Sequence, residues 1–412
     1  MALISDPIAV TQPNPSAFKI VMLLCGAQVL AMTGFATYPA LLTRIMDAWQ
    51  MSGTEAGLVG GAFFFGYMVA VPFLSGLTDR VDARLVFAMS CVLAALGSVG
   101  FGWLASGVGT GVFFQALTGA GLAGTYMPGL KAMTDRVQGA QQSRYVSFYT
   151  ATFGLGASVS LLLAGWCVAV LSPSATFLVA GAFPLMAIPL VMWRLAPHQP
   201  VGGVKRWWPS FSGVWAQVAV RQYVIGYAVH CWELFGLRSW QVAFFAFAFG
   251  LGATQAWVSP TEAAALLNLL GLPASIFGNE MAAKLGRRRW IGGIMLASGL
   301  LAWLAGASSV LPWMFTLAMA ALYNVVVMAD SASLTAGLVA ESDPSQRGAA
   351  MALYSLGGFG AGFVAPVVFG AVLDHTGGHN SPVAWTLAMG VLGLGCLGWS
   401  LRLRWTRRRD QT

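Results

Sequence analysis

Hydrophobic residues run through the 412-residue chain in long stretches separated by short polar or Gly/Pro-rich turns. A helix needs about 20 mostly apolar residues to cross a bilayer, and its backbone groups must be satisfied within the lipid. The stretches are too long and too continuously apolar to be strands of a membrane barrel. The pattern therefore predicts an all-α membrane protein with twelve membrane-spanning helices, at residues 18–46, 53–77, 85–105, 110–130, 145–170, 174–195, 220–249, 259–282, 290–309, 312–338, 349–372 and 384–402.

The basic residues predict how the chain is oriented. If the N-terminus lies in the cytoplasm, 20 of the 22 lysines and arginines fall in inner segments or at inner helix ends. The two exceptions are Arg44, at the outer end of the first stretch, and Arg238, inside the seventh. Because positive charge concentrates in cytoplasmic loops, we expect a multi-pass protein of the cell membrane with both termini in the cytoplasm. The first seventeen residues contain no Lys or Arg, so they do not resemble a secretory signal.

One connection is longer and more polar than the others. Residues 196–219 contain three prolines, three tryptophans and two basic residues. Tryptophan and basic side chains settle at lipid headgroups, so we interpret this segment as a linker along the inner membrane surface. It divides the chain into an N-terminal bundle, residues 1–195, and a C-terminal bundle, residues 220–412, each with six predicted spans.

The two bundles repeat several sequence features. The second span begins with Ser-Gly-Thr-Glu at 52–55 and the eighth with Ser-Pro-Thr-Glu at 259–262. Both fit a capping box, in which a serine and a glutamate satisfy the free N–H groups of a helix start. Gly165 and Gly370, late in the fifth and eleventh spans, are 205 residues apart. These nearly constant offsets predict two pseudo-symmetric bundles, which is a known transporter plan.

The composition excludes several classes of protein. Hydrophobic types make up 57% of the chain and charged types 9%, against about 25% charged residues in soluble domains. A soluble enzyme, a disordered chain and a cytosolic nucleic-acid binder are therefore excluded. The five cysteines are scattered through apolar stretches, so we expect small buried side chains rather than disulfides or a metal site. Without a phosphate-binding glycine loop, neither a nucleotide nor another cofactor is expected.

The loop after the second span carries the most specific motif in the chain. It reads Gly-Leu-Thr-Asp-Arg-Val-Asp-Ala-Arg at 76–84. In this respect the chain resembles the major facilitator superfamily, whose pattern here is G-x-x-D-R-x-G-R-R/K. Asp82 and Ala83 depart from the pattern, with a carboxylate where the family has glycine and an apolar residue where it has a basic one. The four matching residues are Gly76, Asp79, Arg80 and Arg84.

The resemblance implies a fold, a mechanism and a role for this loop. It implies two six-helix bundles that rock about a central site and so transport a solute by alternating access. It also implies that the loop latches the bundles together when the transporter faces outward. In the fourth span, Gln115 precedes Gly119 and Gly121, whereas many proton-linked members carry an arginine at the position of this glutamine.

The seventh span carries a mostly polar stripe. At about 100° per residue, Tyr227, His230, Arg238 and Gln241 share one face and Glu233 lies on its flank. The resemblance implies that this helix lines the central cavity. A guanidinium near the middle of the membrane suits a carboxylate-, nitrate- or phosphate-like group, so we predict that Arg238 anchors an anionic substrate. The alternative is a structural ion pair between Arg238 and a facing acid.

Three ionisable residues are predicted at similar depth on cavity helices: His230, Glu233 and Asp330. Buried ionisable groups of this kind form proton relays in transporters. The alternative is that Asp330 only neutralises His230 or Arg238. Uncharged polar residues complete the predicted substrate site, although helix packing explains such residues equally well. They are Gln28, Gln115, Tyr126, Tyr323 and Asn324.

The sequence therefore favours a secondary active transporter for a small organic or inorganic anion, with proton coupling as an open option. A multidrug or toxic-compound efflux antiporter is the main alternative. A non-transporting membrane sensor on the same fold is a further one. The lipid bilayer and a small solute are the expected partners, nucleic acid is not, and we expect a monomer.

Overall fold

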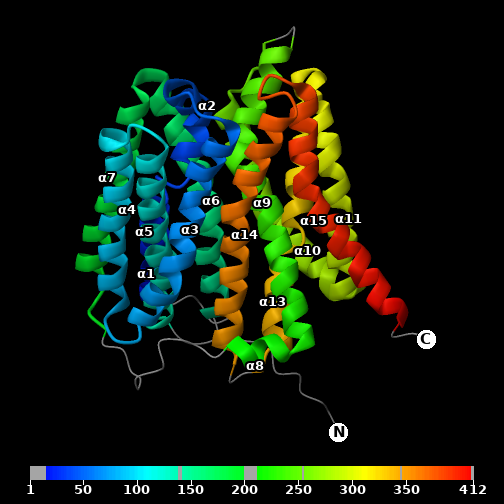
Figure 1. Ribbon diagram of the computed structural model, residues 1–412. Coiled ribbons are helices and arrows are strands. Elements are labelled where there is room, and N and C mark those ends of the chain that lie inside the picture. The colour runs from blue at the N-terminus through cyan, green and yellow to red at the C-terminus, as the bar shows by residue number, and fades with distance from the viewer. Residues whose placement is uncertain (1–14, 138–141, 199–210, 253–254, 344–345, 410–412) are drawn as a thin grey trace.

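The computed structural model describes residues 15–137, 142–198, 211–252, 255–343 and 346–409, and every regular element in these ranges is helical (Figure 1). The N-terminal residues 1–14 and half of the predicted linker, residues 199–210, lie outside the described residues. The helices that precede the linker form a first group: α1 (Pro15–Ala31), α2 (Thr37–Trp49), α3 (Gly53–Leu77), α4 (Ala83–Leu104), α5 (Val108–Thr134), α6 (Gln142–Val170) and α7 (Pro173–Arg194).

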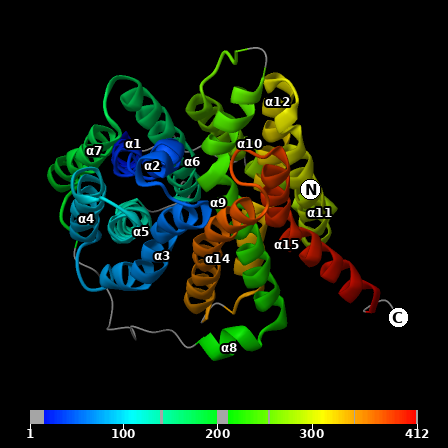
Figure 2. The same cartoon turned by 45° about the horizontal axis from the view of Figure 1, so that its top comes forward.

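A short helix, α8 (Phe211–Ala216), leads from the linker into a second group of helices. In Figure 2 the first group lies on one side of the molecule and the second group on the other. The second group consists of α9 (Val218–Leu251), α10 (Pro260–Leu285), α11 (Arg287–Ala307), the 3-10 turn η1 (Ser308–Val310), α12 (Trp313–Met328), α13 (Ser331–Glu341), α14 (Arg347–His375) and α15 (Pro382–Arg409).

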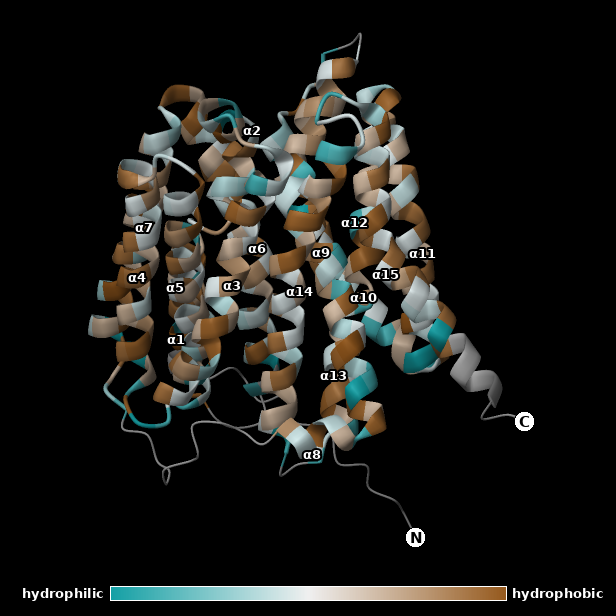
Figure 3. Cartoon of the chain, viewed as in Figure 1, coloured by the Kyte–Doolittle hydropathy of each residue, from teal (hydrophilic) through white to brown (hydrophobic). Residues whose placement is uncertain are grey.

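Ten helical segments of the described chain are long and apolar enough to cross a membrane. Two of the predicted spans, 18–46 and 110–130, are not among them. The first is divided into α1 and α2, and each piece is too short. The second, α5, has 27 residues, but glycine and threonine lower its hydropathy. Figure 3 shows hydrophobic residues along the lengths of the helices, as a protein in lipid requires.

The predicted span 18–46 is not one continuous helix, because the chain unwinds at residues 32–36. Ser160 of α6 stabilises the break: its hydroxyl donates to the Thr33 carbonyl at 2.6 Å and accepts from the Ala36 N–H at 2.9 Å. The Thr33 hydroxyl donates in turn to the Ala180 carbonyl of α7 at 2.8 Å. A neighbouring helix thus supplies the partners that the interrupted helix lacks, as unwound backbone within a membrane requires.

The predicted span 312–338 is also interrupted, at Ala329 and Asp330 between α12 and α13. The indole N–H of Trp290, on α11, donates to the Ala329 carbonyl at 3.0 Å. Asp330 occupies the residue before α13, where its side chain makes no capping bond to the helix and is free to reach another element. Both breaks therefore expose backbone and polar side chains in the interior of a helix group.

The two groups use the same kind of internal contact. A Cβ atom at Gly66 of α3 would overlap the Ala116 carbonyl of α5, and one at Gly278 of α10 would overlap the Ala329 carbonyl. Glycine at these positions lets the backbones approach closely, as in membrane helix pairs generally. The offsets between the paired positions, 212 and 213 residues, are close to those found in the sequence.

The two groups meet chiefly along α3 against α14 and along α6 against α10. The predicted capping boxes are confirmed at the starts of α3 and α10, and we call this end of the molecule the capped end. Here Gly370 of α14 packs on Gly53 of α3, and Gly165 of α6 packs on Thr261 of α10. The opposite end, which we call the basic end, carries Arg80, Lys131, Arg194, Arg287 and Arg347.

Candidate functional site

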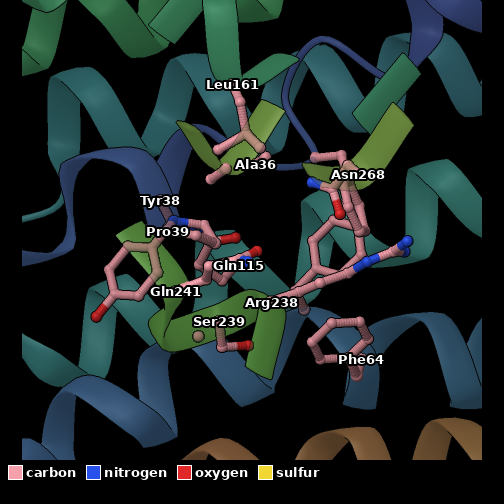
Figure 4. A pocket seen from close by; sticks show the side chains of 14 residues that line it. Ala36, Tyr38, Pro39, Phe64, Gln115, Leu161, Arg238, Ser239, Gln241 and Asn268 are labelled. Atoms are coloured by element: carbon pink, nitrogen blue, oxygen red, sulfur yellow. The ribbon is translucent and has the colours of Figure 1, made fainter. Parts of the chain in front are cut away.

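A pocket lies where the two groups meet, next to the break between α1 and α2 (Figure 4). Its volume is about 30 Å³, which leaves room for a water molecule or two. A solute therefore requires the two groups to move apart at this point. The side chains that the argument below uses are four aromatic residues, Phe35, Tyr38, Phe63 and Phe64, and four polar residues, Gln115, Arg238, Gln241 and Asn268.

Arg238 is the one cation among the residues that line this pocket. Its Nε atom is buried without a hydrogen-bond partner, and its Nη2 lies 4.0 Å from the thioether sulfur of Met328, a weak acceptor. In the part of the chain that the structure describes, no carboxylate lies within 4.0 Å of the guanidinium. The structural ion pair that the sequence left open is therefore not found there.

Three amide side chains share the pocket with Arg238. Gln115 and Gln241 were predicted, whereas Asn268 of α10 was not. Gln241 and Asn268 are 2% and 6% exposed, and each has one buried amide atom without a hydrogen-bond partner. An amide inside the apolar sequence Ala-Leu-Leu-Asn-Leu-Leu was the signal for Asn268, since polar groups in membrane helices mark functional sites. The pocket thus combines one cation with unsatisfied donors and acceptors.

Glu233 does not face the pocket. Its two carboxylate oxygens accept from the Tyr323 hydroxyl at 3.0 Å, the Ser298 hydroxyl at 2.9 Å and the Cys396 thiol at 3.1 Å. These donors come from α12, α11 and α15, so the carboxylate lies inside the second group. Among the described residues, no hydrogen bond joins it to His230 or Asp330.

His230 and Asp330 are brought together by the break between α12 and α13. His230 Nδ1 lies 2.8 Å from Asp330 Oδ1, and both side chains are almost fully buried. Tyr227 lies beside this pair: its ring stacks on Tyr354 of α14 with centroids 3.7 Å apart, and lies 6.0 Å from the His230 ring. Of the two interpretations of Asp330, the geometry shows the acid on His230 rather than on Arg238.

The remaining predicted residues lie outside the pocket. Gln28 is fully buried and accepts from the Tyr149 hydroxyl at 3.1 Å. Tyr126 packs against the Tyr149 ring, with centroids 5.8 Å apart. Tyr323 is committed to Glu233, and the Asn324 amide donates to the Ala320 carbonyl one turn earlier at 2.8 Å. The sequence predicted the helix faces on which these residues lie, but it could not show that they contact other residues of the protein instead of lining the pocket.

The loop at 76–84 is anchored within the first group. Arg84 bonds to Asp82 at 2.7 Å and donates to the Met192 and Leu195 carbonyls at the end of α7. Asp79 and Arg80, by contrast, have exposed side chains, and Gly76 has open space around it. In this conformation Arg84 therefore binds elements of its own group rather than bridging the two groups.

Asp82 is the centre of this anchor. It accepts from the backbone N–H of His198 at 2.9 Å and lies 3.3 Å from Arg136, in the turn that follows α5. Although partial burial opposes ionisation, the bonds from His198 and Arg84 and the charge of Arg136 lower the pKa of Asp82 to about 2. The carboxylate therefore stays ionised at neutral pH and ties α4 and α5 to the start of the linker.

Comparisons with known proteins identify related folds. A family model described as the Major Facilitator Superfamily matches residues 24–272, whereas a search of curated protein sequences finds no match. Similar solved structures include a bacterial homolog of the human lysosomal transporter Spinster in an inward-facing conformation, with 16% identity, 95% of each chain covered and a TM-score of 0.69. The POT family transporter PepTSo has 14% identity, coverage of 97% of this chain and 99% of its own, and a TM-score of 0.75.

Proposed function

Because the chain belongs to the Major Facilitator Superfamily, we propose that it is a secondary transporter built from two six-helix bundles, residues 1–195 and 220–412. The ten long apolar segments already include the α12–α13 pair as one interrupted span. Counting the α1–α2 pair as a second interrupted span and α5 as a full one brings the number of spans to twelve. The equivalent glycine contacts in the two groups support the duplication. The shared basic end supports a cytoplasmic location for both termini, because cytoplasmic loops are rich in Lys and Arg.

The proposed cargo is a small anion, and Arg238 is its proposed anchor. The observation that carries this proposal is a guanidinium in a pocket between the groups that has no carboxylate partner among the described residues. An unpaired charge at such depth is costly, and a bound anion would offset that cost. Gln241, Gln115 and Asn268 are placed to hydrogen-bond the same solute.

Uptake into liposomes tests the anchor. Arg238→Gln is expected to reduce transport of an anionic solute at least tenfold, because truncating one partner of a buried charge pair costs about 2 kcal/mol or more. Arg238→Lys is expected to restore part of it. The matched control is Arg44→Gln, since Arg44 is exposed at the capped end and donates to the Val168 carbonyl at 3.2 Å. Equal rates for wild type and Arg238→Gln across a panel of anions would contradict the proposal.

The aromatic lining of the pocket favours the second candidate, an efflux antiporter for apolar compounds. Phe35, Phe63 and Phe64 present rings to the same space as Arg238, and aromatic rings bind flat apolar cargo well. If this function is correct, a neutral dye should be extruded equally fast by wild type and by Arg238→Gln. Dye extrusion without any anion transport would select this candidate over the first.

Proton coupling is proposed to use the buried His230–Asp330 pair, with Glu233 as a second buried acid in the same bundle. The 2.8 Å distance between His230 Nδ1 and Asp330 Oδ1 supports it, since buried ionisable residues of membrane helices serve as proton relays. Asp330→Asn and Glu233→Gln, each close in shape to the native residue, are expected to lower solute-driven proton movement at least tenfold while leaving exchange of solute intact. Unchanged proton movement in both variants would exclude a relay.

A further inference from the structure

The capped end contains a carboxylate bridge between the two groups. Asp374, in the last turn of α14, accepts from the Gly53 N–H at 2.7 Å and the Thr54 N–H at 2.8 Å, the first two residues of α3. The Thr54 hydroxyl adds a third bond at 2.6 Å. We call these contacts the Asp374 clasp. No sequence motif indicated it, because the residues are 320 or more positions apart.

The clasp completes the start of α3. The first N–H groups of a helix have no partner within the helix. The capping box of α3 supplies a partner for Glu55, whose N–H bonds to the Ser52 hydroxyl at 3.2 Å. Asp374 supplies the partners for Gly53 and Thr54. The start of α3 is therefore fully satisfied only while α14 lies against it.

Electrostatics favours the same contact. A carboxylate at the C-terminal end of a helix faces the negative end of that helix's dipole, which is unfavourable. At the start of α3 the same carboxylate meets the positive end of a dipole instead. Glycine makes this approach possible, because a Cβ at Gly370 would overlap the Gly53 carbonyl. Separation of the groups would leave Asp374 against its own helix end, with only water to compensate.

The equivalent place in the other half has no such bridge. By the 207-residue offset of the capping boxes, Pro260 of α10 corresponds to Gly53, and proline has no N–H to donate. By the 205-residue offset of Gly165 and Gly370, Ala169 corresponds to Asp374. The acceptor and one of the three donors are thus missing from the α6–α10 contact, although Thr261 corresponds to Thr54. The clasp is a one-sided feature added to a repeated contact.

We propose that the Asp374 clasp is a conformational lock that holds the capped end closed and must break each time the transporter opens toward that side. The inference rests on the proposed alternating-access function. It assigns Asp374 a positioning role through the start of α3, at the end of α3 opposite to Asp79. The latch that the family resemblance implies at Asp79 would then act in the conformation in which the clasp is broken.

Pulsed EPR distances in reconstituted protein test the clasp without requiring a known solute. Spin labels report its opening after the five buried native cysteines are replaced. They are placed on cysteines at Ser106 and at Val310, the last residue of η1, which are exposed positions at the capped end of the two groups. Asp374→Asn is expected to raise the ratio of open to closed populations about 3- to 10-fold, from the usual strength of a helix cap. Asp47→Asn, an exposed acid at the same end, is the matched control.

Two further measurements separate the clasp from general destabilisation. Raising the salt concentration should shift wild type toward the open state, because exposed charges are screened, and should shift Asp374→Asn much less. Gly370→Ala, which keeps the carboxylate but blocks the close approach, should also favour the open state. Distances in Asp374→Asn and Gly370→Ala that match those of Asp47→Asn would overturn the proposal. A population shift without flux of any solute would uphold the clasp and count against the proposed function instead.

Discussion

Asp82 occupies the position at which the family motif has glycine, and it changes what the neighbouring arginine does. Its carboxylate holds Arg84 and Arg136 and accepts the His198 N–H. Arg84, a matching motif residue, is thereby committed to the end of α7. The departure from the motif was visible in the sequence, but its consequence depends on residues more than 50 and 110 positions away.

The Asp82 anchor predicts a pH-dependent stability difference. Asp82→Asn should lower the free energy of unfolding at pH 7 by about 1.5–3 kcal/mol, the usual range for hydrogen bonds to a charged group. The native pKa of about 2 lies below the unfolded value of about 3.9. The stabilisation is therefore present above pH 4 and is lost as the pH falls from about 4 to about 2.

Thermal unfolding in detergent between pH 7 and pH 3 measures this difference. The gap between wild type and Asp82→Asn should shrink toward the acidic end, whereas Asp47→Asn, an exposed acid, should track wild type throughout. A gap that stays constant with pH would show that Asp82 does not act through its charge.

Glycines allow the helices of this protein to pack closely, and two of the predicted spans are interrupted where polar groups contact neighbouring helices. The breaks at 32–36 and at Ala329–Asp330 let Ser160 bind interior backbone and let Asp330 reach His230. In a continuous helix the backbone carbonyl and N–H groups at residues 32–36 would bond along the helix axis and could not bind Ser160. Glycines such as Gly278, which faces the Ala329 carbonyl, hold the second break against its neighbour.

The role of Gly278 can be separated from the helix propensity of glycine. Gly278→Ala should destabilise the protein by about 1–3 kcal/mol, because its Cβ would overlap the Ala329 carbonyl and push α10 away from the break between α12 and α13. Gly293→Ala, in α11 with nothing near its Cβ, should be neutral or slightly stabilising. Midpoints of thermal unfolding in detergent measure both, and similar midpoints for the two variants would contradict the close-packing argument.

The whole molecule is held together by two antiparallel contacts, α3 with α14 and α6 with α10, while most other contacts lie within a group. The pocket with Arg238 lies between these contacts, so relative motion of the groups changes it directly. At the capped end the helices of the two groups approach each other closely at glycines, as at Gly53, Gly165 and Gly370. A rigid-body motion of one group against the other therefore alters few internal contacts, which suits alternating access.

If the groups are separate packing units, the chain should tolerate a cut between them. Fragments 1–204 and 205–412, expressed together, are expected to copurify and to retain transport, because the anchor formed by Asp82 and His198 stays in the first fragment. A cut at Ser106 separates α4 from α5, which pack closely against each other, and should abolish assembly. Equal loss for both cuts, measured by copurification, would refute two separate units.

Local chemistry was enough to predict several features of this protein. The apolar stretches, the two capping boxes and the buried cysteines depend only on residue type and short spacing. The structure confirms the capping boxes and the buried cysteines, and ten of the twelve predicted spans are among the helical segments that can cross a membrane. The helical face of Arg238 and Gln241 followed from the 3.6-residue period, and both line the pocket. The family motif pointed to the superfamily before any contact was known.

Tertiary structure alone decided which polar groups meet. Glu233 and His230 are neighbours on one helix, yet packing sends the first to Tyr323 and the second to Asp330. Asn268 enters the pocket and Asp374 caps α3 because distant helices lie side by side, a relation that no local pattern encodes. Hydrophobicity determines where a chain crosses lipid, whereas the pairing of its few buried polar groups depends on the three-dimensional arrangement of the helices that carry them.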